Sequence, residues 1–282
     1  MLHIYDFLTE PLAYEFMQRA LIASVLVGSS CAVFSCFLVV KGWSLMGDAV
    51  SHAVLPGVAL AYVAGLPLLL GAFIAGFLCS LATGYIKDHS RVKEDAVLGI
   101  VFSGMFGFGL VLMTKIESDI HLLHILFGNI LGVSWDQIIQ IALISLPLIL
   151  VLLLKWHDFM LYCFDPAHAR VAGLPVFALH YGLLIALALV IVAALNAAGI
   201  ILVIAMLIAP GATAFLLTNR FGYMLAISLA VSLISTLSGV YASFYLDFAT
   251  APLIVVIQAG VFTMALMFSP AKGLIKKAPL YE

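Results

Sequence analysis

The sequence predicts an all-α protein, a polytopic transmembrane helical bundle, and two observations support this: its composition and the length of its apolar runs. Of 282 residues, 65% are hydrophobic and only 9% are charged, whereas a soluble domain carries about 25% charged residues. So few charges cannot cover a water-facing surface, so the apolar residues must face lipid as well as one another. We expect a single transmembrane domain over residues 1–282.

Nine apolar runs are long enough to cross a lipid bilayer, which takes about 20 residues of helix. The spans are predicted near 17–40, 45–64, 67–86, 95–114, 136–154, 177–196, 199–218, 222–245 and 252–270. The break at 196–199 is the least distinct, so eight spans is the alternative. A weaker apolar stretch at 121–133 is too short to cross and suggests a re-entrant or interfacial helix.

Positive charges gather in alternate loops, and this asymmetry orients the bundle, since cytoplasmic loops are rich in Lys and Arg. With nine spans, a cytoplasmic C-terminus and the N-terminus outside, only Arg19 and Lys115 fall on the outer side. The cytoplasmic side then receives Lys41, Lys87, Arg91, Lys93, Lys155, Arg170, Arg220, Lys272, Lys276 and Lys277.

Several function classes find no support in the sequence. The net charge is −2 and no large basic cluster exists, so no nucleic-acid partner is expected. The chain has no Gly-x-x-x-x-Gly-Lys-Ser/Thr segment and no nucleophile–base constellation, so we expect a transport protein without enzymatic activity of its own. The four cysteines form no Cys-x-x-Cys pair and are expected to be small buried hydrophobes.

One acidic residue, Asp48, stands inside a predicted span, and His52 follows four residues later. An Asp near the centre of a membrane helix costs about 2.5–3.5 kcal/mol on insertion scales, so it needs a reason to be there. The i, i+4 spacing puts both side chains on one helix face, about 5–6 Å apart, where they can share one cation. The alternative is that the two side chains only hydrogen-bond each other or cap a broken helix.

Two ligands are too few to hold such a cation, because transition metals take four to six. A symmetric dimer would supply a second Asp/His pair, with the hydroxyl of Ser51 nearby. Oxygen and nitrogen ligands without thiolates suit Mn²⁺, Fe²⁺ or Zn²⁺ and disfavour Cu(I). Gly47 and Pro56 flank the pair as pathway support, since glycine lets helices approach closely and proline removes one backbone hydrogen bond.

The cytoplasmic loop 155–175 contains a second candidate element, a very short helix at about 165–172. Asp165 is predicted as its N-cap, Pro166 as its first residue and Gly173 as its left-handed end. Because two turns of helix are only marginally stable alone, we expect this helix to pack against the membrane face or another protein. Phe164 and Arg170 belong to the same candidate docking element. In the outer loop, Glu117, Asp119, His121 and His124 are weaker candidates for guiding a cation.

The segment 41–57, Lys-Gly-Trp-Ser-Leu-Met-Gly-Asp-Ala-Val-Ser-His-Ala-Val-Leu-Pro-Gly, resembles the signature of the permeases of manganese/iron/zinc ABC importers. The likeness covers about 14–270 and continues through His-Ile-Leu-Phe-Gly-Asn at 124–129, the 164–175 loop and Ala-Pro-Gly-Ala at 209–212. The Thr-Ala-Pro turn at 250–252 is more similar to the manganese/iron branch, because zinc relatives tend to carry Pro-Ser-Gly there.

This resemblance implies a homodimer in the bacterial cytoplasmic (inner) membrane, two cytoplasmic ATPase subunits and an extracytoplasmic metal-binding protein that delivers the ion. It also implies that Asp48 and His52 coordinate the metal, and that 165–172 is the coupling helix seated in the ATPase. No permanently bound cofactor is implied, only the transported Mn²⁺, Fe²⁺ or Zn²⁺, moved by alternating access.

Three alternatives remain open on the sequence alone. A proton-coupled secondary transporter could use Asp48 and His52 as a relay and would need no ATPase. A permease for a metal chelate would instead have a wide apolar cavity. A second, different permease chain could also replace the homodimer.

Overall fold

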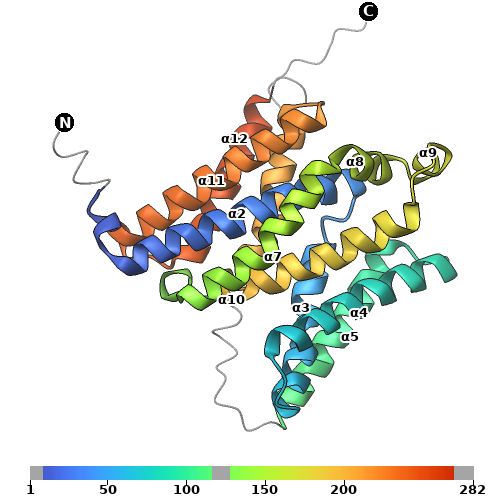
Figure 1. Cartoon of the computed structure of the whole chain (residues 1–282), viewed down its shortest axis with the longest axis horizontal. Helices are drawn as coiled ribbons and strands as arrows, with labels where there is room; N and C mark the ends of the chain where they lie inside the picture. Colours follow the sequence, from blue (N-terminus) through green and yellow to red (C-terminus); the bar gives the residue numbers. More distant parts are fainter. Residues whose placement is uncertain (1–8, 116–127, 270–282) are drawn as a thin grey trace, which may run out of the picture.

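The computed structural model describes residues 9–115 and 128–269, and within these ranges it contains helices and no strand. The long helices are α2 (Glu15–Lys41), α3 (Met46–Val63), α4 (Leu68–His89), α5 (Glu94–Met113), α7 (Trp135–Leu154), α10 (Val176–Leu217), α11 (Phe221–Leu246) and α12 (Thr250–Phe268). Short elements are η1 (Pro11–Ala13), η2 (Ile130–Gly132), α8 (Trp156–Phe164) and α9 (Pro166–Val171). The predicted all-α membrane fold is confirmed (Figure 1).

α10 supplies two of the nine candidate spans, Val176–Leu195 and Ala197–Leu217. Its 42 residues would make a straight helix of about 63 Å, twice the thickness of a bilayer core of about 30 Å. The helix is broken at Gly199, where φ is 74° and ψ is 166°, a conformation that suits glycine. Nine spans are therefore confirmed for the described residues, and the eight-span alternative is wrong.

Contacts on either side of Gly199 show that the chain folds back on itself there. His180, in the first half of α10, contacts Tyr162 of α8, while in the second half the amide of Gly211 donates to Ser35 Oγ, 2.9 Å away. Both contacts lie toward the end of the bundle that carries Lys41, whose Nζ is 4.2 Å from the Tyr162 ring centre. We call this side the Lys41 end and the opposite side the Glu15 end.

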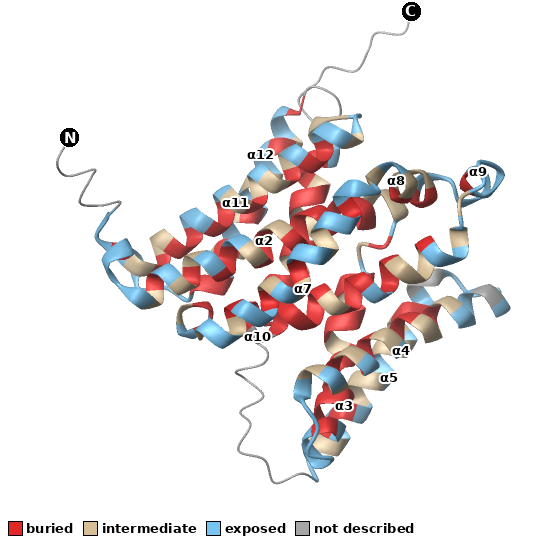
Figure 2. Ribbon diagram, in the orientation of Figure 1, coloured by how far each residue is buried: buried red, intermediate tan, exposed pale blue. Residues whose placement is uncertain are grey.

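Small residues and hydroxyls hold α2 against α10 and α11. Ser228 Oγ donates to the carbonyl of Ala32, and Ser232 Oγ donates to that of Gly28, both at 2.8 Å. Such close approach with interhelical hydrogen bonds is the usual packing of membrane helices, because lipid tails remove the hydrophobic drive between them. Figure 2 shows that buried residues concentrate in the middle of the bundle, whereas α9 is mostly exposed.

α3, α4 and α5 form a group on one side of the bundle (Figure 1). Here α3 and α4 pack backbone to backbone: a Cβ added at Gly57 would lie 2.0 Å from the carbonyl oxygen of Gly71. Ala61 and Ala75, each four residues further along, continue the contact and make a small-xxx-small stripe on both helices. α5 covers the outside and leaves side chains such as Ile100 exposed.

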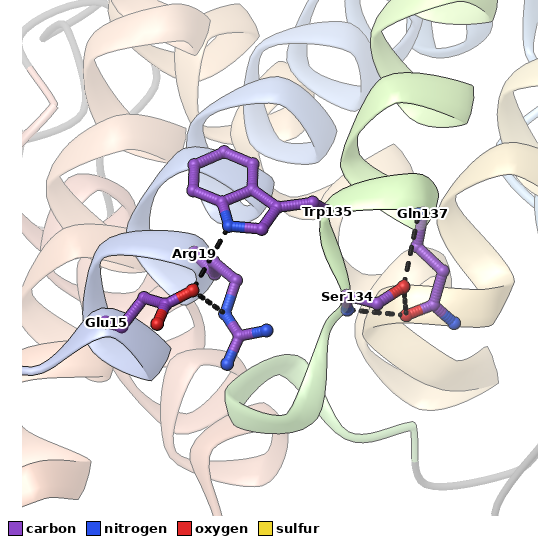
Figure 3. Close-up of polar contacts among 5 residues, drawn as sticks. All are labelled: Glu15, Arg19, Ser134, Trp135 and Gln137. Atoms are coloured by element: carbon purple, nitrogen blue, oxygen red, sulfur yellow. Dashed lines mark hydrogen bonds and ion pairs between the residues drawn. The ribbon is translucent and has the colours of Figure 1, made fainter.

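The start of α7 is fixed to the start of α2 at the Glu15 end (Figure 3). Ser134 and Gln137 form a capping box, with Gln137 N donating to Ser134 Oγ and Ser134 N donating to Gln137 Oε1. Trp135 Nε1 donates to Glu15 Oε1 at 3.3 Å, and the same carboxylate lies 4.0 Å from Arg19 Nε. Arg19, the cation nearest a span interior at this end, is thus paired locally with Glu15.

Candidate functional site

Asp48 and His52 lie in the first two turns of α3, and their side chains meet. His52 Nδ1 is 3.1 Å from Asp48 Oδ1 and 3.0 Å from the backbone carbonyl oxygen of Asp48. The i, i+4 juxtaposition expected from the spacing is present. Asp48 also lies in the first turn, where the positive end of the helix dipole favours a carboxylate.

The hydrogen bonds assign the tautomer of His52. A carbonyl oxygen can only accept, so Nδ1 must carry the hydrogen that it shares with the carbonyl and the carboxylate of Asp48. In the neutral ring, Nε2 then keeps its lone pair. A histidine whose Nδ1–H is held by a carboxylate is the arrangement that orients Nε2 toward a metal.

The surroundings of His52 come from α5. The ring lies edge-on to Phe106, with centroids 5.4 Å apart, and 6.0 Å from the ring of Phe102. The side chains are not enclosed by this single chain: His52 is 26% exposed and Asp48 is 33% exposed. An ionisable pair open on the surface of a membrane helix requires either a covering partner or a water-filled path.

The pair is level with the middle of a neighbouring candidate span. A methyl group added at Gly47, next to Asp48, would lie 3.0 Å from Leu207 Cδ1. Leu207 is ten residues from each end of the span Ala197–Leu217, so Asp48 is level with the centre of a neighbouring span. α3 therefore begins deep in the bundle and not at its surface.

The supporting residues Gly47, Ser51 and Pro56 occupy different positions around the pair. Ser51 is buried, and its Oγ donates to the carbonyl of Gly47 at 2.7 Å. Because Ser51 directly precedes His52, its side chain lies about 100° around α3 from the Asp48–His52 face. Pro56 has no N–H for the carbonyl of His52, so this oxygen lacks its usual helical donor. Gly109 of α5 packs against Pro56, since a Cβ there would lie 2.8 Å from the proline nitrogen.

This site brings two ligand side chains of one chain together. Among the described residues, no group of three or more His, Cys, Asp or Glu side chains could hold a metal ion. The four cysteines are free and buried, as expected from the sequence. The weaker loop candidates Glu117, Asp119, His121 and His124 fall outside the described residues, as does most of the 121–133 stretch.

The short helix expected at 165–172 is present as α9, capped as predicted. Asp165 Oδ1 accepts from the amides of Ala167 and His168 at 2.9 and 3.0 Å, and Gly173 has φ 81°. Val171 on this helix is 86% exposed, and Phe164, the last residue of the preceding helix α8, is 80% exposed.

α8, directly before α9, was not predicted. It is separated from α7 only by a break at Lys155, so its apolar residues merge with the preceding span in the sequence. Phe102 and Phe106 were also missed, because an aromatic residue in an apolar span carries no mark of what it faces.

The sequence matches one known protein family over nearly its whole length. The model of the ABC 3 transport family matches residues 13–269. The chain belongs to the ABC 3 transport family. Membership in this family, together with nine candidate spans in the part of the chain that the structure describes, makes it a multi-pass permease of the bacterial inner membrane.

Individual members of the family are similar over nearly their whole length. The chelated iron transport system membrane protein YfeD of Yersinia pestis is 57% identical, over 98% of this chain and 94% of that protein. The manganese transport system membrane protein MntB of Synechocystis sp. is 50% identical, over 96% of this chain and 89% of that protein. Among solved structures, PsaBC of Streptococcus pneumoniae in complex with Fab matches with a TM-score of 0.85 and 34% identity, covering 95% of this chain and 97% of that chain.

Proposed function

We propose that this chain is the permease subunit of an ATP-driven importer for a divalent transition metal, with Mn²⁺ as the first candidate and Fe²⁺ or Zn²⁺ as alternatives. The observation that carries the proposal is the Asp48–His52 pair, open to one side at the depth of the membrane centre. The relatives named for manganese and chelated iron transport support the same class of cargo.

The pair supplies one nitrogen and one carboxylate to the passing ion. His52 Nε2 offers a lone pair because Nδ1 is committed to Asp48, and the second carboxylate oxygen of Asp48 is available for the cation. Few ligands suit a transit site, because an ion held too tightly would not leave. No thiolate takes part, which favours Mn²⁺, Fe²⁺ or Zn²⁺ over Cu(I).

Two copies of the chain, each presenting this face, would complete the coordination. One chain contributes two side chains, while such ions take four to six ligands. Pairing across the open face of α3 would also cover Asp48, whose side chain one chain alone leaves 33% exposed. The proposed unit is therefore a homodimer, with a separate ATPase on each copy and an extracytoplasmic binding protein delivering the ion. Alternating access of the dimer interface carries the ion inward.

Substitution of the pair tests the proposal directly. In proteoliposomes that contain the complete importer, Asp48→Asn and His52→Ala should each lower the initial rate of ATP-dependent Mn²⁺ uptake by about tenfold or more. Matched controls are Asp136→Asn and His157→Ala, which make the same changes at exposed positions outside α3 and should leave uptake unchanged.

Two results would contradict this function. Wild-type uptake by assembled variants would remove Asp48 and His52 from the pathway. Uptake driven by a pH gradient without ATP would favour the secondary transporter instead. Competition among Mn²⁺, Fe²⁺ and Zn²⁺ in the same vesicles ranks the cargo.

We further propose that α9 is the coupling helix and that the Lys41 end is cytoplasmic. The exposed side chains of Val171 on α9 and of Phe164 at the end of α8 form an apolar surface that a partner protein would cover. In the described residues, seven Lys and Arg lie at the Lys41 end and two at the Glu15 end, which supports this orientation: Lys41, Lys87, Arg91, Lys93, Lys155, Arg170 and Arg220 against Arg19 and Lys115.

Introduced cysteines test both statements in one experiment. The native thiols give little background because all four are buried, and burial raises the pKa of Cys163 to about 12. A membrane-impermeant maleimide should label Val171→Cys only in inside-out vesicles, and the ATPase subunit should protect it. Val92→Cys, at the same end but on the α4–α5 turn, should label equally and be protected less.

Leu66→Cys, on the α3–α4 turn at the Glu15 end, should label only in right-side-out vesicles. Reversed labelling would invert the orientation. Equal protection of Val171→Cys and Val92→Cys by the ATPase would show that the ATPase does not dock specifically on α9.

A further inference from the structure

Two side chains on either side of α9 are hydrogen-bonded to each other. Tyr162 lies near the end of α8, and His180 lies in the second turn of α10. The Tyr162 hydroxyl is 2.6 Å from His180 Nδ1, although 18 residues separate the two along the chain. α9 lies between them in the sequence. The hydrogen bond therefore closes the loop that carries α9.

The imidazole of His180 also contacts segments that lead to α3. Its ring centre is 5.5 Å from that of Trp43, and the two rings meet edge to face. On the side of Nε2, a Cβ added at Gly84 of α4 would lie 3.8 Å away. α4 is in turn packed against α3 through Gly57. His180 thus contacts α8, α4 and the residues that precede α3.

Lys41 adds a second contact between α8 and Trp43. Its Nζ lies 4.2 Å from the centre of the Tyr162 ring and 5.6 Å from that of Trp43, within the range of a cation–π interaction. Both aromatic side chains are buried, with Tyr162 2% and Trp43 3% exposed. Because protein interiors have low compressibility, buried groups in contact transmit a displacement from one to the next.

The backbone of Trp43 is bonded to both helices that it separates. Its amide donates to the carbonyl of Leu38 in α2 at 2.8 Å, and its carbonyl accepts from the amide of Met46 at 3.0 Å. Met46 is the first residue of α3, and Asp48 lies in the same turn. A displacement of Trp43 therefore moves the turn of α3 that carries Asp48.

We propose that Tyr162, His180 and Trp43 form a joint that transmits movement of α9 to the Asp48–His52 pair. This inference rests on the proposed function, in which the ATPase docks on α9 and the pair holds the ion. When the ATPase displaces α9, the bond between Tyr162 and His180 makes the end of α8 and the start of α10 move together. His180 then shifts Trp43, and with it the first turn of α3. The three side chains are positioning residues, because they act through the pair.

The number of Mn²⁺ ions moved per ATP hydrolysed tests the joint, in proteoliposomes that contain the complete importer. Tyr162→Phe keeps the ring beside Lys41 but removes the hydroxyl that bonds to His180. It should lower this ratio roughly fivefold, the shift in an equilibrium that the loss of one hydrogen bond causes. ATP hydrolysis should stay close to the wild-type rate, because the exposed Val171 on α9 is unchanged. A merely structural role would lower both rates together.

Two substitutions elsewhere are the matched controls. Tyr223→Phe removes a hydroxyl from an exposed ring at the Lys41 end, and Ser228→Ala removes one hydrogen bond between buried helices. Both should leave the ratio of Mn²⁺ to ATP unchanged. Two variants at the centre of the joint add a rescue. His180→Asn keeps a polar atom close to the place of Nδ1 and should retain more of the ratio than His180→Leu, which cannot bond to Tyr162.

Several outcomes would overturn the joint. An unchanged ratio in Tyr162→Phe and His180→Leu, beside normal uptake by the wild type, would show that the contact does not transmit the movement. Equal losses in the control variants would show a general effect of weakened packing. If Tyr162→Phe does not assemble, His180→Asn and His180→Leu decide, because equal ratios in these two would also refute the joint. A wild type without ATP-dependent uptake would instead refute the proposed function on which the joint rests.

Discussion

The bundle contains two regions that are packed by different means. In the body, formed by α2, α7, α10, α11 and α12, hydroxyl groups cross between helices, as Ser232 does to the carbonyl of Gly28. In the α3–α5 layer, the closest contact is between two backbones, at Gly57 and Gly71. Figure 1 shows the layer on one side of the body.

This difference matters for the candidate site because α3 belongs to both regions. Its first turn contacts the body, where Gly47 packs on Leu207, and its second half is locked to α4 through Gly57. The hydrogen bonds between helices of the body are directional and fix the register of one helix against the next. The contact between the glycines of α3 and α4 is close but includes no such directional bond. Asp48 and His52 therefore lie at the junction between the two regions.

The largest expected effect comes from filling the glycine contact of the layer. In Gly57→Val, the new Cβ would lie 2.0 Å from Gly71 O and 2.6 Å from Ala75 Cβ, so the helices must separate. We expect the free energy of unfolding to fall by about 3 kcal/mol or more, at the upper end for overpacking. Thermal unfolding in detergent measures it.

Gly104→Ala on α5 is the matched control for this substitution. No atom lies within 4 Å of a Cβ added there, so the change should be neutral or stabilise by up to about 1 kcal/mol. If Gly57→Val were as harmless as this control, the close contact between α3 and α4 would not be a determinant of the layer.

The spans, the cap of α9 and the approach of Asp48 to His52 could be predicted from the sequence, because each depends on chain length or on neighbouring residues alone. Span length follows from bilayer thickness, and the cap at Asp165 depends only on neighbouring residues. The approach of Asp48 to His52 likewise follows from helix geometry alone.

The contacts between helices were not predictable in the same way. A membrane helix is apolar on every side, so its sequence does not indicate which face meets a neighbour. Small residues such as Gly57 and Gly71 mark close packing, but nothing in either segment identifies the other as its partner. The aromatic neighbours of His52 were missed for the same reason. α8 was missed because its apolar residues continue the run of the preceding span.

A smaller effect of opposite sign is expected at a buried amide in the body. Gln258 of α12 is 1% exposed, and neither polar atom of its side chain has a partner in the described part of the chain. Gly239 of α11 packs on Ile254 of α12, and the two helices are antiparallel. Ser235, one turn before Gly239, is therefore level with Gln258, one turn after Ile254. The hydroxyl of Ser235 also has no hydrogen-bond partner among the described residues. Gln258→Met should stabilise the chain by about 1–2 kcal/mol, because an unsatisfied amide is removed.

Gln140→Met, at an exposed position on α7, is the control and should leave the unfolding temperature nearly unchanged. Destabilisation by Gln258→Met would mean that the amide is satisfied by water or by a second chain. The body would then depend on a polar contact that one chain does not provide.

The smallest effect is expected from the serine hydrogen bonds that distinguish the body from the layer. Ser228→Ala and Ser232→Ala each remove one bond from α11 to a carbonyl of α2, worth about 0.6 kcal/mol in a membrane protein. Ser238→Ala is the control, because its hydroxyl bonds only to carbonyls of its own helix, such as that of Ile234. Thermal unfolding of the two single variants and of the double variant measures the losses. If each serine cost as much as Gly57→Val, hydroxyl bonds would dominate the packing of the body. If the losses are small and additive, the bonds set the register of α2 against α11 while close packing supplies the stability of both regions.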